Sequence, residues 1–145
     1  MNIPGTNPLI IVGDTDGLIA ILSSEDVNHK KAVATVAKLL QFEAQTVFPI
    51  TAIAETITTL KRKLNRPELA TSLIAQITNG ELVLEDVDKE MLNVALSFFD
   101  PKGSKKNTLF DALVIATAKK LNTKLIFSTD DWYTKQGLRL AASLL

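Results

Sequence analysis

The stretch Leu9-Ile-Ile-Val-Gly-Asp-Thr-Asp-Gly17 joins a short apolar run directly to two carboxylates. Leu9 to Val12 is continuous and rich in β-branched residues, which is typical of a strand buried on both faces of a parallel sheet. Gly13 closes the run, and Asp14 and Asp16 follow it. Because open parallel sheets bind ligands beyond the carboxyl ends of their strands, the residues that follow this strand are the first candidates for a functional site.

Strands and helices alternate along the rest of the sequence. Further strands are expected at 46–50, 81–85, 124–128 and, more weakly, 138–141. Helices are expected from a start signal at 23–26 through residue 40, and at 51–64, 67–79, 88–99 and 108–121. This alternation predicts an α/β fold, a three-layer α/β/α sandwich with a central, mostly parallel sheet. The length predicts a single domain over residues 1–145.

The composition restricts the chemistry that the chain can perform. The 145 residues include no cysteine, which excludes thiolate zinc sites, iron–sulfur clusters and a Cys nucleophile. His29 is the single histidine and is interpreted as a helix residue without a chemical role. Sixteen Lys and Arg balance sixteen Asp and Glu, so binding of nucleic acid by bulk positive charge is not expected. No early apolar run is long enough for a membrane span, and we expect a cytoplasmic protein without a membrane partner.

Acidic residues follow the predicted strands or begin the helices beside them. They are Asp14, Asp16, Glu55, Asp111, Asp130 and Asp131. A parallel sheet would bring these segments together at one edge. Carboxylates that gather without an equal number of bases repel one another, and they are stable together mainly when a divalent cation lies between them. The pattern therefore favours a metal site built from oxygen ligands.

Each acid also has an ordinary structural explanation. Asp14 and Asp16 could cap the next helix, where Asp is common. At 100° per residue, Glu55 points away from the apolar stripe of its helix, where a solvated Glu would lie. Asp111 is harder to explain in this way, because its helix is apolar nearly all round and an isolated acid there costs free energy.

The ordered set of motifs resembles the PIN-domain family, the metal-dependent ribonucleases that include the VapC toxins of toxin–antitoxin pairs. The segments that carry the resemblance are 9–22, 28–32, 49–55, 110–118, 125–133 and 137–140. Residue by residue, the catalytic and metal-binding acids of the family fall on Asp14, Glu55, Asp111 and Asp130. The resemblance implies that Thr15 and Ser128 orient these acids. Asp16 and Asp131 are expected to support the same site.

Two positions depart from the family pattern. Asp16 stands where the family usually has Asn or Ser, and Trp132 stands where a further Asp is frequent. Tyr133 falls at the position of the usual aromatic residue. The rings of Trp132 and Tyr133 could stack on nucleobases, although aromatic residues beside a strand end more often pack against the core. Packing is therefore their expected role.

The resemblance implies hydrolysis of RNA phosphodiester bonds with Mg²⁺ or Mn²⁺ as the cofactor. One or two such ions would generate a hydroxide and stabilise the charge of the transition state. The implied partners are an RNA substrate, a small antitoxin protein and a second copy of the chain in a homodimer. A lysine loop just before Asp111 could guide an RNA backbone or could simply be solvated. Its residues are Lys102, Lys105 and Lys106.

Two other functions stay open at this point. Asp14-Thr-Asp-Gly17 after an apolar strand also resembles the start of the haloacid-dehalogenase-like phosphatases, in which Asp14 would be the nucleophile. Against this reading, Leu18 replaces the usual Thr, and Asp111 and Glu55 would have no role. The other alternative is a PIN-like module that binds RNA or protein without turnover. The presence of all four family acids disfavours it.

Overall fold

Parallel strand pairings organise the chain into one sheet, with the order β3-β2-β1-β4-β5. The computed structural model describes residues 8–145. The strands of this part are β1 (Ile10–Gly13), β2 (Gln45–Pro49), β3 (Val83–Glu85), β4 (Leu125–Phe127) and β5 (Arg139–Leu140). In the central register, Val12 lies opposite Val47 on one side and opposite Ile126 on the other. The parallel sheet and its flanking helices confirm the predicted fold class.

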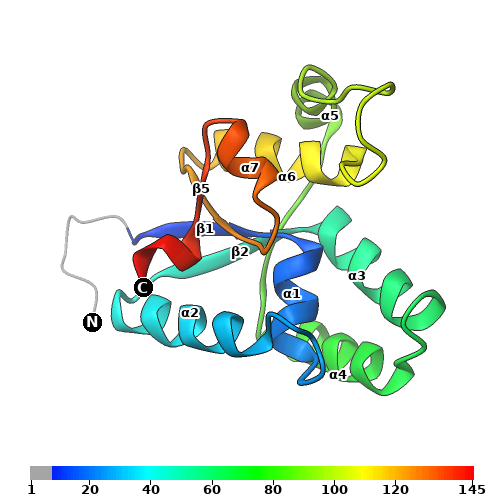
Figure 1. The fold of residues 1–145 in the computed structure, drawn as a ribbon, viewed down its shortest axis with the longest axis vertical. Helices are drawn as coiled ribbons and strands as arrows, with labels where there is room; N and C mark the ends of the chain where they lie inside the picture. The colour runs from blue at the N-terminus through cyan, green and yellow to red at the C-terminus, as the bar shows by residue number, and fades with distance from the viewer. Residues whose placement is uncertain (1–7) are drawn as a thin grey trace.

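Helices cover both faces of the sheet (Figure 1). They are α1 (Thr15–Leu22), α2 (His29–Gln41), α3 (Ile50–Arg62), α4 (Pro67–Thr78), α5 (Lys89–Leu96), α6 (Leu109–Lys120), α7 (Trp132–Lys135) and the short 3-10 helix Ala141–Leu144. Within the described residues, none of these helices has both the length and the apolar character needed to cross a membrane.

The alternation of side chains along the central strands separates two apolar layers. Ile11 and Phe127 face one side of the sheet, where they pack against α1, α2 and the 3-10 helix. Val12 and Ile126 face the other side, where they pack against α6 and the buried Tyr133 of α7. Successive residues of a strand point to opposite faces, and these strands are apolar on both. The buried residues after Leu9 therefore pack against helices on both faces of the sheet.

The segment after β1 differs from the expectation. The helix expected after the start signal at 23–26 forms as α2, but it begins only at His29. A further helix, α1, begins directly after Asp14 and was not predicted. Residues 23–26 form the turn between the two helices, closed by the Asp26 N–H donating to the Ser23 carbonyl at 3.1 Å. Ser and Asp favour turns as strongly as helix starts, so their pattern alone does not separate the two.

Gly17 explains how α1 can lie so close to the sheet. A Cβ atom at this position would stand 2.3 Å from the backbone carbonyl oxygen of Phe127, at the end of β4. Only glycine permits this approach of helix to strand. His29 completes the local packing, since its Nδ1 lies 2.8 Å from the Ala20 carbonyl oxygen.

The chain reverses its direction of travel across the sheet at β1. From β1 it proceeds through β2 to β3 on one side, and it returns to place β4 and β5 on the other side. Such a switch point leaves a crevice at the carboxyl ends of the two strands that flank it. Asp14 follows β1 at this edge, and Ser128 to Asp130 follow β4.

Candidate active site

Asp14 is the most buried acid of this edge, with 2% of its surface exposed. Its Oδ1 accepts a hydrogen bond from the Gly17 N–H at 2.9 Å and so caps α1, and its Oδ2 accepts one from Ser128 Oγ at 2.6 Å. Burial raises the pKa of Asp14 to about 8, although the hydrogen bonds from Ser128 and Gly17 oppose this rise. The carboxylate is thus fixed in orientation while its ionised form is destabilised, and a cation would relieve that cost.

Glu55 is held by α1 although it lies on α3. Thr15 Oγ1 lies 2.5 Å from Glu55 Oε1 and 3.2 Å from the Ala52 carbonyl oxygen, and it can donate to either. Burial raises the pKa of Glu55, the Thr15 hydroxyl lowers it, and the nearby charge of Asp16 raises it again. The first residue of α1 therefore sets the direction of a carboxylate 40 residues away.

Asp111 lies in the first turn of α6. Its Oδ2 accepts a hydrogen bond from the Thr108 N–H at 2.9 Å, and the Tyr133 hydroxyl lies 3.4 Å from its Oδ1. Burial raises its pKa to about 6, with further increases from Glu55, Asp130 and Asp16. Three carboxylates from three other segments thus act on this one group, which shows that the tertiary structure brings the acids together.

Tyr133 lies between two of these acids. It is fully buried, and its pKa is raised well above the ordinary value by burial and by the charges of Asp14 and Asp111. The phenol therefore remains a neutral hydrogen-bond donor at the base of the site. Its ring packs in the core as expected.

Asp130, which follows β4, and Asp16 of α1 complete the group. Asp130 Oδ1 accepts a hydrogen bond from the Trp132 N–H at 2.9 Å, and its Oδ2 accepts one from Asn107 Nδ2 at 3.1 Å. Desolvation raises the pKa of Asp16, the charge of Asp130 raises it further, and the ammonium of Lys63 lowers it. The two acids are therefore close enough to interact, with a lysine beside them.

Four of these acids open into one cleft with a volume of about 660 Å³. The residues that line it are Asp16, Glu55, Asp111, Asp130, Thr15, Thr59, Thr108, Thr129, Lys63, Lys105, Lys106 and Ile19. Asp14 lies buried behind this lining, joined to it through the neighbouring Thr15. The cleft combines carboxylates, hydroxyls and ammonium groups, which can hold a hard cation and a phosphate together. We refer to it as the acid cleft.

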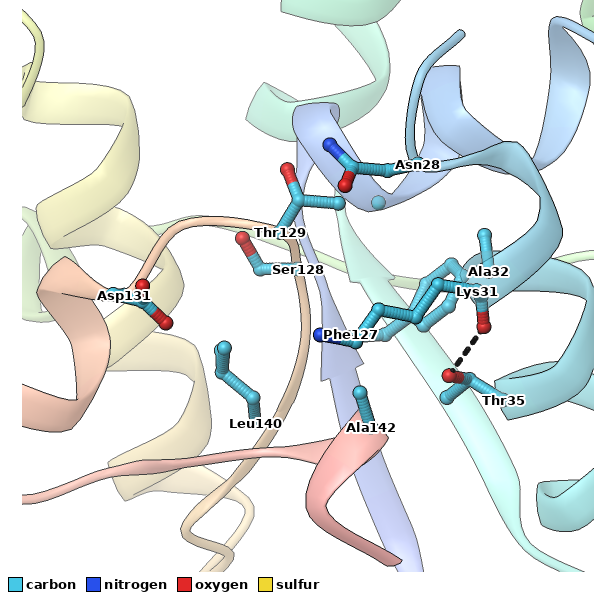
Figure 2. Close-up of a pocket in the computed structure, with 11 residues that line it drawn as sticks. Asn28, Lys31, Ala32, Thr35, Phe127, Ser128, Thr129, Asp131, Leu140 and Ala142 are labelled. Atoms are coloured by element: carbon cyan, nitrogen blue, oxygen red, sulfur yellow. Dashed lines mark hydrogen bonds between the residues drawn. The ribbon is translucent and has the colours of Figure 1, made fainter. Parts of the chain in front are cut away.

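Besides the buried pair Asp14 and Ser128, two exposed sequence candidates lie outside the acid cleft. Lys102 is exposed in the loop before α6 and does not line it. Asp131 is also exposed, and it borders a smaller cavity of about 220 Å³. Figure 2 shows this cavity, with Asn28 and Lys31 on one side of Ser128 and Asp131 on the other side.

Several polar residues of the cleft were not singled out from the sequence. Thr108 lies three residues before Asp111, and this spacing is the signature of a capping box that could have revealed it. Asn107, which donates a hydrogen bond to Asp130, is the residue directly before Thr108. Lys63 and Thr129 carry no comparable signal, because their position at the cleft depends on where α3 and β4 end.

The donor set fits a divalent cation with a preference for oxygen ligands. The pKa of each of Asp16, Glu55 and Asp111 is raised by at least one neighbouring acid, which is the electrostatic imbalance that such an ion relieves. In residues 8–145, however, no group of three acidic side chains is arranged to hold one ion. The carboxylates of Asp14, Glu55, Asp111 and Asp130 instead accept hydrogen bonds from nearby protein donors.

Comparisons with known proteins agree with this architecture. The family model described as PIN domain matches residues 11–136. The crystal structure of Mycobacterium tuberculosis VapC20, described as a Sarcin-Ricin loop cleaving toxin, superimposes with a TM-score of 0.75 at 18% sequence identity, over 89% of this chain and 96% of that one. No curated protein matches the sequence. Since the family match spans most of its length, this chain belongs to the PIN domain family.

Proposed function

We propose that the chain is a divalent-metal-dependent endoribonuclease, a hydrolase of RNA phosphodiester bonds. The observation that carries the proposal is the convergence of Asp16, Glu55, Asp111 and Asp130 on the acid cleft. Burial and the charge of at least one neighbouring acid raise the pKa of Asp16, of Glu55 and of Asp111. Such a cluster suits Mg²⁺ or Mn²⁺ together with a phosphodiester. Membership of the PIN domain family supports the same activity.

The proposed roles follow from the environment of each acid. Asp14, Asp111 and Asp130 would hold the metal, and Glu55 would hold a second ion or position the attacking water. When bound, the metal supplies a hydroxide at neutral pH and charge stabilisation for the transition state. Thr15 and Ser128 act by orienting Glu55 and Asp14, to which they are bonded.

Lysines on the walls of the acid cleft provide contacts for the RNA backbone. Lys105 and Lys106 line one side of the cleft, and Lys63 lies beside Asp16. Ammonium groups bind phosphates without reading sequence, and this binding weakens as salt rises. Lys102 and Asp131, which lie outside the cleft, would contribute only at longer range.

The biological setting is proposed from the structural similarity to VapC20. We propose that the single PIN-like domain of residues 1–145 is the toxin of a cytoplasmic toxin–antitoxin pair. Its partners would be an RNA, a small antitoxin protein and a second copy in a homodimer. Co-expression with the product of an adjacent short reading frame, followed by measurement of the mass of the purified complex, tests both protein partners.

The activity is tested with purified wild type and Asp111→Asn in Mn²⁺, Mg²⁺ or excess EDTA. End-labelled tRNA and rRNA fragments serve as substrates, with p-nitrophenyl phosphate in parallel. Asp88→Asn is the matched control, because Asp88 also accepts a backbone hydrogen bond at a helix start, 2.9 Å from the Met91 N–H, and does not line the acid cleft. We expect cleavage at discrete sites that EDTA and Asp111→Asn abolish and that Asp88→Asn retains.

Other results of this assay would favour the alternatives. Phosphatase turnover that depends on Asp14 and ignores Asp111 would overturn the proposal in favour of a phosphatase. If neither substrate reacts and calorimetry detects no Mn²⁺ binding, the chain is a non-catalytic binding module.

A further inference from the structure

A second cavity adjoins the acid cleft and is lined by aromatic side chains. It has a volume of about 560 Å³ and is lined by residues of α7, of the segment just before it and of the segment between α5 and α6. Phe98, Phe99 and Trp132 provide its aromatic surface. We refer to it as the aromatic pocket. Its volume falls within the range of about 300–1,000 Å³ that is usual for sites of small organic ligands.

The two cavities share part of their lining. Lys106, Thr108 and Asp130 border both the aromatic pocket and the acid cleft. A ligand that places a phosphate in the acid cleft can therefore extend into the aromatic pocket without leaving the protein surface. Asp130 lies at the boundary, since one of its oxygens accepts from the Trp132 N–H and the other from Asn107 Nδ2.

Trp132 is held in place by a backbone hydrogen bond and by packing against the core. Its backbone is fixed by the bond to Asp130, and its ring makes an edge contact with the buried Tyr133, with centroids 5.2 Å apart and planes at 65°. The side chain is half-buried and the rest of it lines the pocket. A rigid aromatic surface of this kind loses little conformational entropy when another ring stacks on it.

Polar groups surround this aromatic surface. Asn107, Gln136 and Ser104 offer hydrogen-bond donors and acceptors. The charged lining consists of two ammonium groups, Lys106 and Lys135, and three carboxylates, Asp100, Asp130 and Asp131. A flat ring with polar edges, attached to an anionic chain, matches this combination of stacking surface, amides and ammonium groups. An aliphatic ligand would leave the amides and hydroxyls without partners.

We propose that the aromatic pocket binds one unpaired nucleobase of the RNA substrate, stacked on Trp132, beside the phosphodiester held in the acid cleft. This inference rests on the proposed ribonuclease function and assigns a nucleobase subsite next to its acid cleft. A base can enter the pocket only if it is unstacked from its neighbours, so the preferred substrate is a single-stranded segment or loop. Duplex RNA keeps its bases stacked inside the helix.

The protein contains its own probe for this contact, because Trp132 is the single tryptophan among its 145 residues. Wild type in excess EDTA, where hydrolysis is suppressed, is titrated with a short single-stranded oligoribonucleotide while tryptophan fluorescence is recorded. An abasic strand of equal length and the same strand in a duplex are the controls. We expect saturable quenching by the intact single strand and little change with either control.

Three results of the titration would overturn the proposal. Equal quenching by the abasic strand would mean that only the backbone contacts this region. Absence of quenching at saturating RNA would mean that the base lies elsewhere. Fluorescence that changes with protein concentration alone would assign the pocket to a contact between copies of the chain.

A kinetic test uses Trp132→Ala and Trp132→Phe. Loss of one base-stacking contact is expected to raise KM about 5- to 150-fold, with kcat changed by no more than about 2-fold. Trp132→Phe retains an aromatic face and should recover most of the wild-type KM. Phe42→Ala is the matched control, because Phe42 is half-exposed and lies after α2, outside both cavities. A wild-type KM in a folded Trp132→Ala protein would refute the stacking contact.

The two proposals fail in different ways. RNA cleavage without any response of Trp132 fluorescence would leave the ribonuclease in place and remove the nucleobase site. Quenching by single-stranded RNA in a protein that cleaves nothing would retain the nucleobase site and remove the ribonuclease.

Discussion

Replacing Asp111 by Asn should stabilise the metal-free protein at alkaline pH. The pKa of Asp111 rises from 3.8 to about 6 in the folded protein, mainly because of burial and also because of Glu55, Asp130 and Asp16. At about 1.4 kcal/mol per pKa unit, ionisation costs the folded state about 3 kcal/mol. The side chain is partly exposed, so solvent screening reduces this to about 1–2 kcal/mol. The substitution removes the charge that carries this cost.

The hydrogen bonds of Asp111 survive the substitution. The asparagine carbonyl can still accept from the Thr108 N–H, now 2.9 Å from the carboxylate. The asparagine amide group faces the Tyr133 hydroxyl, which can accept as well as donate. The comparison therefore isolates the charge. For a protein of this size, we expect an increase in Tm of about 3–8 °C at pH 8 with EDTA.

The pH dependence has a definite sign. A carboxyl whose folded pKa is raised stabilises the native state below its unfolded pKa of 3.8, and this contribution is lost as the pH rises through about 6. The advantage of Asp111→Asn should therefore be largest above pH 7 and mostly absent at pH 4. Thermal unfolding followed by circular dichroism at both pH values measures it.

Asp88→Asn is the control variant for this measurement. Asp88 is exposed, caps α5 and lies near Lys120, so Asp88→Asn should leave the Tm unchanged or lower it slightly at pH 8. If Asp111→Asn lowers the Tm at pH 8 in EDTA, the carboxylate is a net stabilising cap. Burial and the neighbouring acids would then not make ionised Asp111 a net cost to the stability of the folded protein.

Other perturbations test the rest of the site. Saturating Mn²⁺ should raise the Tm of wild type at pH 8, with about 2.7 kcal/mol of stabilisation when its concentration is 100 times the Kd. The increase in Tm should be far smaller at pH 5. Scanning calorimetry with and without EDTA measures both values. Thr15→Val should lower kcat/KM for RNA about 10- to 100-fold because Glu55 loses its hydroxyl partner. Thr15→Ser keeps a hydroxyl and should retain most of the activity. Equal activity of the two variants would contradict this role of Thr15. Gly17→Ala should lower the free energy of unfolding, measured in urea, by about 1–3 kcal/mol or more. The reason is that the added Cβ would stand 2.3 Å from the Phe127 carbonyl oxygen. An unchanged free energy of unfolding would disprove the close approach.

Parts of this structure follow from local sequence patterns. The run after Leu9 forms the buried central strand, and the apolar helix that begins beside Asp111 forms α6, as predicted. Both patterns are strong because burial on several sides requires uninterrupted apolar residues. In contrast, α1 was not predicted, since its apolar residues form one short continuous run, Leu18 to Leu22, without a helical stripe.

The sequence alone determined which acids are available and that they meet at one edge of a parallel sheet. The tertiary structure decided how each is oriented. Asp130 accepts a hydrogen bond from Asn107 and lines the acid cleft, whereas its neighbour Asp131 does not line this cleft. No periodicity distinguishes two adjacent acids after a strand. Glu55 enters the cleft because Thr15 lies opposite it. Side-chain direction beyond a strand end depends on turns and on partners distant in the chain, and these exist only after the sheet has formed.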